Sequence, residues 1–271
     1  MGNKIIELIK NNQIKRVDKD TNFKFSCKQC GGCCTNRINE EAIILSPYDV
    51  FRIAKGLGKE PQDVLQEYAE FTVGHTSYLP IPLLQNKKLS NGSTQCILQN
   101  ENKCSVQAYK PDVCRMFPLG RTLCINDDEP KIEYFLQNIE CAGKFTTPND
   151  VHKLDDWIPN RQESEQAFAK FSEFVQEYRD TTMKLILDNE NISDELKNKL
   201  LSATIDIMYT NYDTSQDFLE QFDRNRNTWL GIQHTIDNKY RELLDLEQNI
   251  EQENEFEEEN ELQHRNSHKW R

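Results

Sequence analysis

The chain has 271 residues and a formal net charge of −12, from 45 acidic and 33 basic side chains. This length is enough for one large domain or two small ones with a real hydrophobic core. Ten acids and no Lys or Arg lie between Glu242 and Gln263, which leaves 35 acids against 33 bases elsewhere. A nucleic-acid-binding protein needs a basic surface, so the composition argues against that class.

Apolar runs in this sequence are short. None approaches the roughly 20 residues that a membrane-spanning helix needs, so we predict no membrane partner. The first 25 residues also have no apolar stretch of the kind that marks a secretory signal. We therefore expect a cytoplasmic protein.

The cysteines form the clearest pattern, because all nine lie between positions 27 and 141. The densest stretch reads Cys27-Lys-Gln-Cys30-Gly-Gly-Cys33-Cys34. Four such small side chains within eight positions would bury almost nothing, so ordinary packing does not explain them. The remaining cysteines follow at wider spacing: Cys96, Cys104, Cys114, Cys124 and Cys141.

Disulfides and metal binding are the two chemistries that this stretch allows. Disulfides suit small secreted proteins, whereas this chain is larger, has an odd number of cysteines and shows no secretory signal. A Cys-x-x-Cys turn aims two sulfurs at one point, and thiolates are soft ligands that select zinc, cuprous copper or iron–sulfur clusters. Gly31 and Gly32 permit positive φ there. Four local cations either offset thiolate charge or are ordinary solvated surface charges: Lys28, Arg37, Arg115 and Arg121.

Between the first cysteines and Cys96, the sequence predicts helices and a strand. Ser46 and Pro47 are typical of a helix start, and the helix should end near Leu57, before Gly58. Residues 62–73 are predicted to form a second helix. Short strands are predicted at 77–84, 95–99, 118–125 and 132–137.

The second group of cysteines has its own setting. Cys96 precedes a short apolar run and is predicted to lie on a strand. One helical turn should separate Cys104 from Pro111, and Pro111 should fix the start of the segment that carries Cys114. Cys124 alternates with apolar neighbours, which favours a small buried strand residue rather than a ligand.

Two motifs in this order resemble a known family. Phe25-x-Cys27-x-x-Cys30-Gly31-x-Cys33-Cys34, followed by Cys96, Cys104 and Tyr109-x-Pro111-x-x-Cys114-Arg115-x-Phe117-Pro118, is similar to the CxxCxxCC or YkgJ-type family of zinc- or iron-chelating domains. Flagellin lysine N-methylases carry a similar domain. The resemblance covers about residues 23–145. One departure is Lys110, where the family often has Arg.

The resemblance implies metal chelation and does not by itself imply an enzyme. The metal ligands that it implies are eight cysteines, which suffice for two four-ligand sites or for one larger cluster: Cys27, Cys30, Cys33, Cys34, Cys96, Cys104, Cys114 and Cys141. Structural zinc prefers paired Cys-x-x-Cys motifs, of which one is clean here. The triple spacing of Cys27, Cys30 and Cys33 with a remote fourth cysteine is the ferredoxin arrangement for [4Fe–4S]. The interpretation leans slightly toward iron–sulfur.

After about residue 150 the pattern becomes helical. Phe168, Phe171, Val175 and Tyr178 share one helix face, and a second helix should begin at Ser193. A third helix carries an apolar seam from Phe218 to Ile250, at alternating steps of four and three residues. An amphipathic helix on the protein's own core explains this seam better than a coiled coil with a partner.

Together these elements predict an α+β fold, with a small cysteine-rich metal-binding domain followed by a helical C-terminal region. We expect an N-terminal helix or linker at 1–22, the cysteine domain at 23–147, the helical region at 148–250 and a disordered acidic tail at 251–271.

Three functional hypotheses follow from this organisation. In the first, the protein binds zinc or an iron–sulfur cluster through its thiolates. In the second, it is a metal-dependent lysine N-methyltransferase similar to the flagellin methylases. In the third, the metal is structural, and the C-terminal helices bind a protein partner. Whether the protein is an enzyme stays open.

Overall fold

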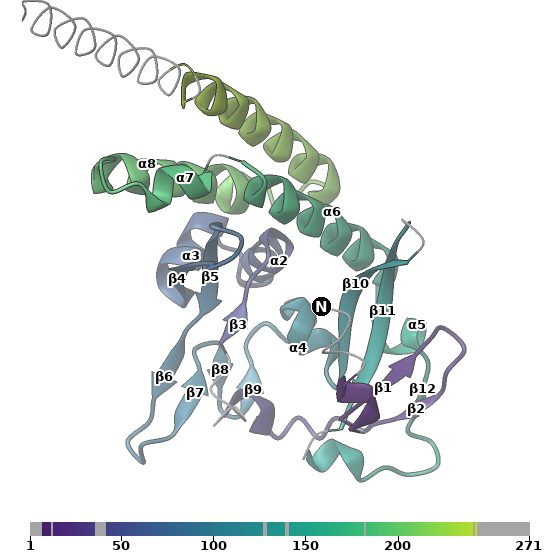
Figure 1. Ribbon diagram of the computed structural model, residues 1–271. Coiled ribbons are helices and arrows are strands. Elements are labelled where there is room, and N and C mark those ends of the chain that lie inside the picture. The colour runs from purple at the N-terminus through teal and green to yellow at the C-terminus, as the bar shows by residue number, and fades with distance from the viewer. Residues whose placement is uncertain are drawn as a thin grey trace, which may run out of the picture.

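The computed structural model describes residues 7–11, 13–35, 42–126, 129–138, 141–181, 183–240 and 242. It is a mixed α+β fold with short antiparallel strands and a helical C-terminal region, as predicted (Figure 1). The strands are β1 Ile14–Val17, β2 Phe23–Lys24, β3 Ile43–Ile44, β4 Ala69–Val73, β5 Pro80–Leu84, β6 Asn86–Lys88, β7 Thr94–Cys96, β8 Gln99–Asn100, β9 Lys103–Cys104, β10 Leu119–Asn126, β11 Glu129–Gln137 and β12 Val151–His152.

Helices occur on both sides of residue 150, and the longest ones follow it. They are the short turns η1 Gly32–Cys34, η2 Gln107–Tyr109 and η3 Ala142–Lys144, the α-helices α2 Pro47–Leu57, α3 Pro61–Tyr68, α4 Asp112–Met116, α5 Leu154–Trp157, α6 Arg161–Arg179, α7 Met183–Asp188 and α8 Asp194–Ile205, and the π-helix η4 Asp206–Thr210. A further helix covers residues 218–240. Figure 1 shows α6, α7 and α8 as a layer over α2 and α3. The predicted acidic tail at 251–271 lies outside the described residues.

Helix α2 forms where the sequence predicts it. The Ser46 hydroxyl accepts a hydrogen bond from the Asp49 N–H at 3.2 Å, and the Asp49 carboxylate accepts one from the Ser46 N–H at 2.8 Å. These reciprocal bonds satisfy N–H groups that have no partner within the helix. Gly58 ends the helix in the left-handed region, at φ 62°.

The predicted helix at 62–73 is correct only up to Tyr68. Residues 69–73 form β4, which pairs antiparallel with β5 from Ala69 opposite Leu84 to Val73 opposite Pro80. Phe71, which has helical spacing to the apolar Val64 and Tyr68, is 44% exposed on β4. Pairing with a strand further along the chain therefore outweighs the helical spacing of the apolar residues.

The strands form small antiparallel sheets instead of one large sheet. β10 and β11 form a hairpin with β1 on the outer side of β11, and β5 lies between β3 and β4. β6 pairs with β7, β8 with β9, and β12 with β2. The strands predicted at 118–125 and 132–137 are confirmed as β10 and β11, while the one predicted at 95–99 is divided into β7 and β8.

Two hydrophobic cores hold these elements together. The larger one joins α2 and α3 to α6 and to helix 218–240, with Phe51, Phe174 and Trp229 buried in it. The smaller one gathers Phe23, Phe25 and neighbouring side chains from β1, β10, β11 and α5. The cysteine-bearing loops lie between the two cores, because Cys34, Cys104 and Cys114 pack on the larger core and Cys141 on the smaller.

The described part of the C-terminal seam is mainly core. Phe218, Phe222 and Trp229 are buried against this chain's own helices, as the amphipathic interpretation predicts. Ile232 is 38% exposed, and the seam positions after residue 242 lie outside the described residues. Ser193 caps α8, as predicted, by accepting a hydrogen bond from the Leu196 N–H. Among the described helices, none has the length and apolar character needed to cross a membrane.

Candidate metal centre

The first cysteine motif is a turn that docks on the strands carrying the second group. Gly31 adopts φ 72°, and the Cys34 N–H donates to its carbonyl at 2.9 Å. A Cβ at Gly31 would lie 2.1 Å from the Gln99 side-chain nitrogen, so only glycine allows this approach to β8. The prediction of positive φ is confirmed for Gly31, whereas Gly32 stays outside the left-handed region.

The next residue secures the same contact. The Thr35 hydroxyl donates to the Gln99 side-chain oxygen at 3.1 Å, and the Thr35 backbone forms a bridge with Gln95 of β7. Docking on β7 and β8 brings the first motif beside the strands that end at Cys96 and Cys104. As predicted, Cys96 lies on a strand, and one helical turn, η2, separates Cys104 from Pro111.

Cysteines from distant parts of the chain line one pocket of about 130 Å³. The six that line it are Cys27, Cys30, Cys33, Cys34, Cys104 and Cys141. Phe25 and Phe117, whose rings meet edge to face at 5.7 Å, form an apolar part of its wall. The fold therefore gathers thiols that are more than 100 residues apart in the sequence.

Cys34 links this pocket to the two remaining predicted ligands. Its sulfur lies 3.8 Å from that of Cys33. The contact with Cys33 and burial raise the pKa of the Cys34 thiol, and the charges of Cys96 and Cys114 raise it further. All eight predicted ligands are thus at the pocket or interact electrostatically with a residue that lines it.

The thiols differ sharply in exposure. Cys27, Cys30 and Cys33 are exposed, Cys96 is buried at 5% exposure, and the other predicted ligands are intermediate. None of the nine cysteines, all of which lie in the described residues, forms a disulfide. Within the part of the chain that the structure describes, no three Cys, His, Asp or Glu side chains form a compact metal-ligating group. The chemistry of the donors fits a soft metal, and the ligand sets remain a prediction.

The cations around the pocket differ from those that the sequence predicts. Lys28 lines the pocket as expected, together with Lys103 and Lys110. Lys110 is the residue that replaces the family's usual Arg, and at the pocket it supplies general positive charge. Arg37 lies outside the described residues.

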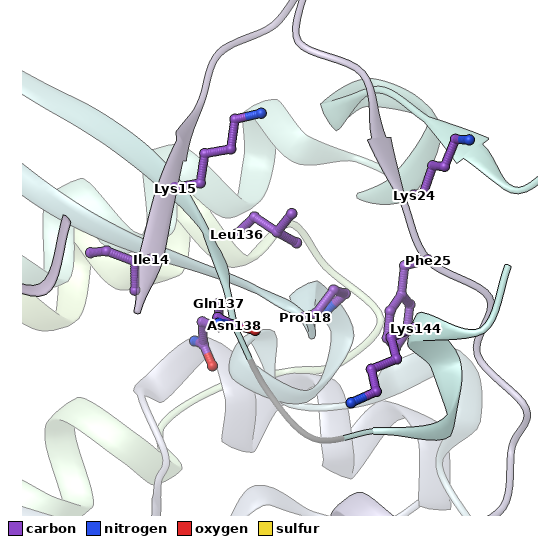
Figure 2. A pocket seen from close by; sticks show the side chains of 9 residues that line it. All are labelled: Ile14, Lys15, Lys24, Phe25, Pro118, Leu136, Gln137, Asn138 and Lys144. Carbon is purple, nitrogen blue, oxygen red and sulfur yellow. The ribbon is translucent and has the colours of Figure 1, made fainter. Parts of the chain in front are cut away.

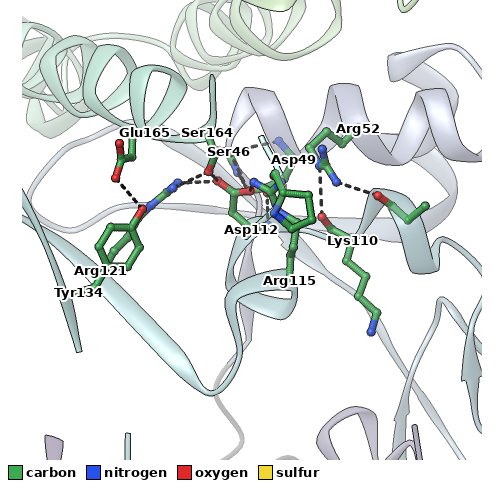
Figure 3. Close-up of polar contacts among 12 residues, drawn as sticks. Ser46, Asp49, Arg52, Lys110, Asp112, Arg115, Arg121, Tyr134, Ser164 and Glu165 are labelled. Atoms are coloured by element: carbon green, nitrogen blue, oxygen red, sulfur yellow. Dashed lines mark hydrogen bonds and ion pairs between the residues drawn. The ribbon is translucent and has the colours of Figure 1, made fainter. Parts of the chain in front are cut away.

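Arg115 and Arg121 instead bind the carboxylate of Asp112, at 2.6 and 2.5 Å (Figure 3). The expectation that these two arginines offset thiolate charge is therefore wrong. Their partner is a carboxylate only 8% exposed, and Coulomb attraction is strongest where water is excluded.

This buried network was missed by the sequence analysis. The Asp112 N–H donates to the Asp49 carboxylate at 2.6 Å, and the Ser164 hydroxyl donates to Asp112 at 2.6 Å. Burial and the charge of Asp112 raise the pKa of Asp49. Burial opposes ionisation of Asp112 as well, but Arg121 and Arg115 outweigh it and lower the pKa of Asp112. The network joins α2, α6 and β10 to α4, the helix that carries Cys114.

Cys124 does not line the pocket. It lies on β10, as predicted, but is half-buried, and its thiol donates to the Glu133 carboxylate at 3.6 Å. Burial and that carboxylate raise the pKa of the Cys124 thiol. It is therefore a natural control for experiments on the other eight cysteines.

A second cavity, of about 310 Å³, is also lined by Phe25 (Figure 2). Ile14, Leu136 and Pro118 give it an apolar lining, and Lys15, Lys24 and Lys144 stand at its edge. Phe25 lines both spaces, so this cavity and the cysteine pocket are neighbours.

Comparison with known families agrees with this geometry. Residues 26–142 match the model of the CxxCxxCC family, described as "Putative zinc- or iron-chelating domain". The match covers less than half of the 271 residues, so the chain is similar to this family over its cysteine-bearing region. The matched residues include all eight predicted ligands, from Cys27 to Cys141, so the resemblance expected from the two motifs is confirmed. No curated protein and no solved structure matches the chain.

Proposed function

We propose that the protein binds zinc or iron, as ions or as an iron–sulfur cluster, through the thiolates of its CxxCxxCC domain. The ligands are Cys27, Cys30, Cys33, Cys34, Cys96, Cys104, Cys114 and Cys141. The observation that carries the proposal is the single pocket lined by six of these cysteines, with Cys34 interacting with Cys96 and Cys114 behind it.

The surroundings of the pocket suit a thiolate centre. Four thiolates on one Zn²⁺ carry a net charge of −2, which Lys28, Lys103 and Lys110 offset. A metal ion must displace the proton of each thiol that binds it. Since the pKa of Cys34 is raised, this thiol stays protonated without metal, and metal binding should release protons and weaken as the pH falls.

The direct test is to purify the full chain without oxygen and to measure zinc, iron and acid-labile sulfide per folded protein. We expect zinc, or iron with sulfide and a visible charge-transfer band. The Cys124→Ser variant should retain the full metal content, since Cys124 lies away from the pocket. Folded protein that contains neither metal nor sulfide, and takes up neither on reconstitution, contradicts the proposal.

The other hypotheses stay predictions. A methyltransferase would bind S-adenosylmethionine, and calorimetry with that cofactor measures the binding directly. A protein partner on the C-terminal helices would be lost from a chain truncated near Asp213. A cytoplasmic location also stays a prediction.

A further inference from the structure

The cavity of about 310 Å³ beside the cysteine pocket has no part in the proposed metal binding. Its volume is in the range of small-molecule sites. Lys15, Lys24 and Lys144 line it, and its described lining contains no aspartate or glutamate. Figure 2 shows the side chains of Leu136 and Pro118 in the middle of the view, with the three lysines placed around them. The cavity therefore combines an apolar wall with positive charge.

The charge of these three lysines is not neutralised by any carboxylate that the structure describes. All three are exposed, and Lys144 lies over the Phe145 ring at 5.8 Å. The lysine ion pairs in the described part of the chain are made elsewhere, by Lys59, Lys170 and Lys199. Like charges around one cavity repel one another, and an anion between them is attracted to each.

Backbone hydrogen bonds hold the walls of the cavity in place. The Gln137 N–H donates to the Pro118 carbonyl at 3.1 Å, where the β10–β11 hairpin opens. β1 then places Ile14 opposite Gln137 and Lys15 opposite Leu136. Although Ile14 and Leu136 are large and apolar, both stay half-buried. The described side chains thus leave an apolar surface open to a ligand, in walls that are already formed.

We propose that this cavity binds a small organic anion, namely a carboxylate or a phosphate monoester with an apolar body. The apolar body covers the wall formed by Ile14, Leu136 and Pro118, and its burial favours binding. The anionic group interacts with the three lysines, which gives preference over a cation of the same shape. This function is additional to metal binding and does not depend on it.

The experiment titrates the full chain, purified without oxygen, with octanoate and with phenyl phosphate, and measures binding by calorimetry. We expect a single site with a Kd of about 1 mM or tighter for the better of the two. The two probes distinguish a carboxylate from a phosphate ester. Octylamine, which has a similar chain but the opposite charge, and inorganic phosphate, which has no apolar body, should bind about tenfold more weakly than the better probe.

Removal of the lysine charges should weaken this binding. Each of Lys15→Gln, Lys24→Gln and Lys144→Gln should raise the Kd by a factor of about two to five, as for an exposed ion pair, and the triple variant by about tenfold. The matched control is Lys131→Gln, at an exposed lysine of the same hairpin that is not among the lining residues, and its Kd should not change. Ile14→Glu puts a carboxylate at the cavity and should remove binding.

The proposal is wrong if neither octanoate nor phenyl phosphate binds at millimolar concentration, or if octylamine binds as well as octanoate. Binding that survives the triple variant also contradicts it, because the anion then lies elsewhere. Inorganic phosphate that binds as tightly as phenyl phosphate would contradict the role of the apolar wall. If the triple variant does not fold, the single variants and Ile14→Glu decide. Metal content, measured on the same preparations, should be unchanged in every variant, so a failure of the proposed metal binding is seen separately.

Discussion

The helical region and the cysteine domain are stabilised in different ways. In the helical region, α6 and helix 218–240 bury large aromatic side chains against each other, such as Tyr178 stacked on Trp229 at 5.5 Å. In the cysteine domain, several strands have only two residues, and three of the predicted ligands are exposed. Short elements with little apolar burial depend on cross-links such as a structural metal. We therefore expect metal binding to stabilise the cysteine domain and to add little to the stability of the helical region.

The largest effect should come from Trp229→Ala. Trp229 is fully buried, and removing a large aromatic side chain from a core costs about 3–5 kcal/mol. Because Trp229 stacks on Tyr178 within the helical region, the loss in free energy of unfolding should be the same with and without zinc. Urea titrations of both forms measure it, with Ile232→Ala at the 38% exposed position as a control that should lose far less. If zinc strongly changes the loss of stability in Trp229→Ala, then the helical region depends on metal as the cysteine domain does.

A somewhat smaller effect, about 3 kcal/mol, is expected for Asp112→Asn, because it leaves Arg115 and Arg121 buried without a negative partner. This change should also weaken metal binding, since Asp112 opens α4, the helix that carries Cys114. Thermal unfolding and zinc titration test the two effects. Asp155→Asn, at an exposed ion pair with Arg161, is the matched control and should change little.

The same variant has a pH signature. The lowered pKa of Asp112 means that its contribution to stability is present above the unfolded value of about 3.9 and is lost as the pH falls through the folded value. The difference in stability between wild type and Asp112→Asn should therefore shrink in acid. A difference that stays constant from neutral pH down to the acid transition would show that the charge of Asp112 is not the cause.

Gly143→Ala tests the packing beside the cysteine pocket, and the free energy of unfolding should fall by about 2 kcal/mol. A Cβ there would lie 2.4 Å from the Phe25 ring, so either the ring or the segment after Cys141 must move. We expect weaker zinc binding together with the loss of stability. Gly231→Ala is the contrasting control in the helical region: no atom lies within 4 Å of its added Cβ, so it should stabilise the helix by up to about 1 kcal/mol.

The smallest effect expected is that of Ser46→Ala, about 1 kcal/mol, from loss of the cap of α2. Ser46→Thr should restore most of it, because threonine keeps the hydroxyl that accepts the Asp49 N–H bond. Denaturant unfolding measures both variants. An unchanged midpoint for Ser46→Ala would mean that the core around α2 holds the helix without its cap.

The sequence by itself determined the features that depend on a few neighbouring residues. The cap at Ser46 and the left-handed Gly58 bound α2 as predicted. The motif from Cys27 to Cys34, with the later Pro111 and Cys114, was enough to identify the CxxCxxCC family. These signals act within a few residues, where steric and hydrogen-bonding preferences decide the conformation.

Only the tertiary structure decided which distant groups meet. It placed Arg115 and Arg121 on Asp112 instead of at the thiols, and it turned residues 69–73 from the predicted helix into β4. It also separated the buried Cys96 from the exposed Cys27, although both lie within the same family match. Burial and strand pairing depend on segments far apart in the chain, and no local pattern encodes which of them come together.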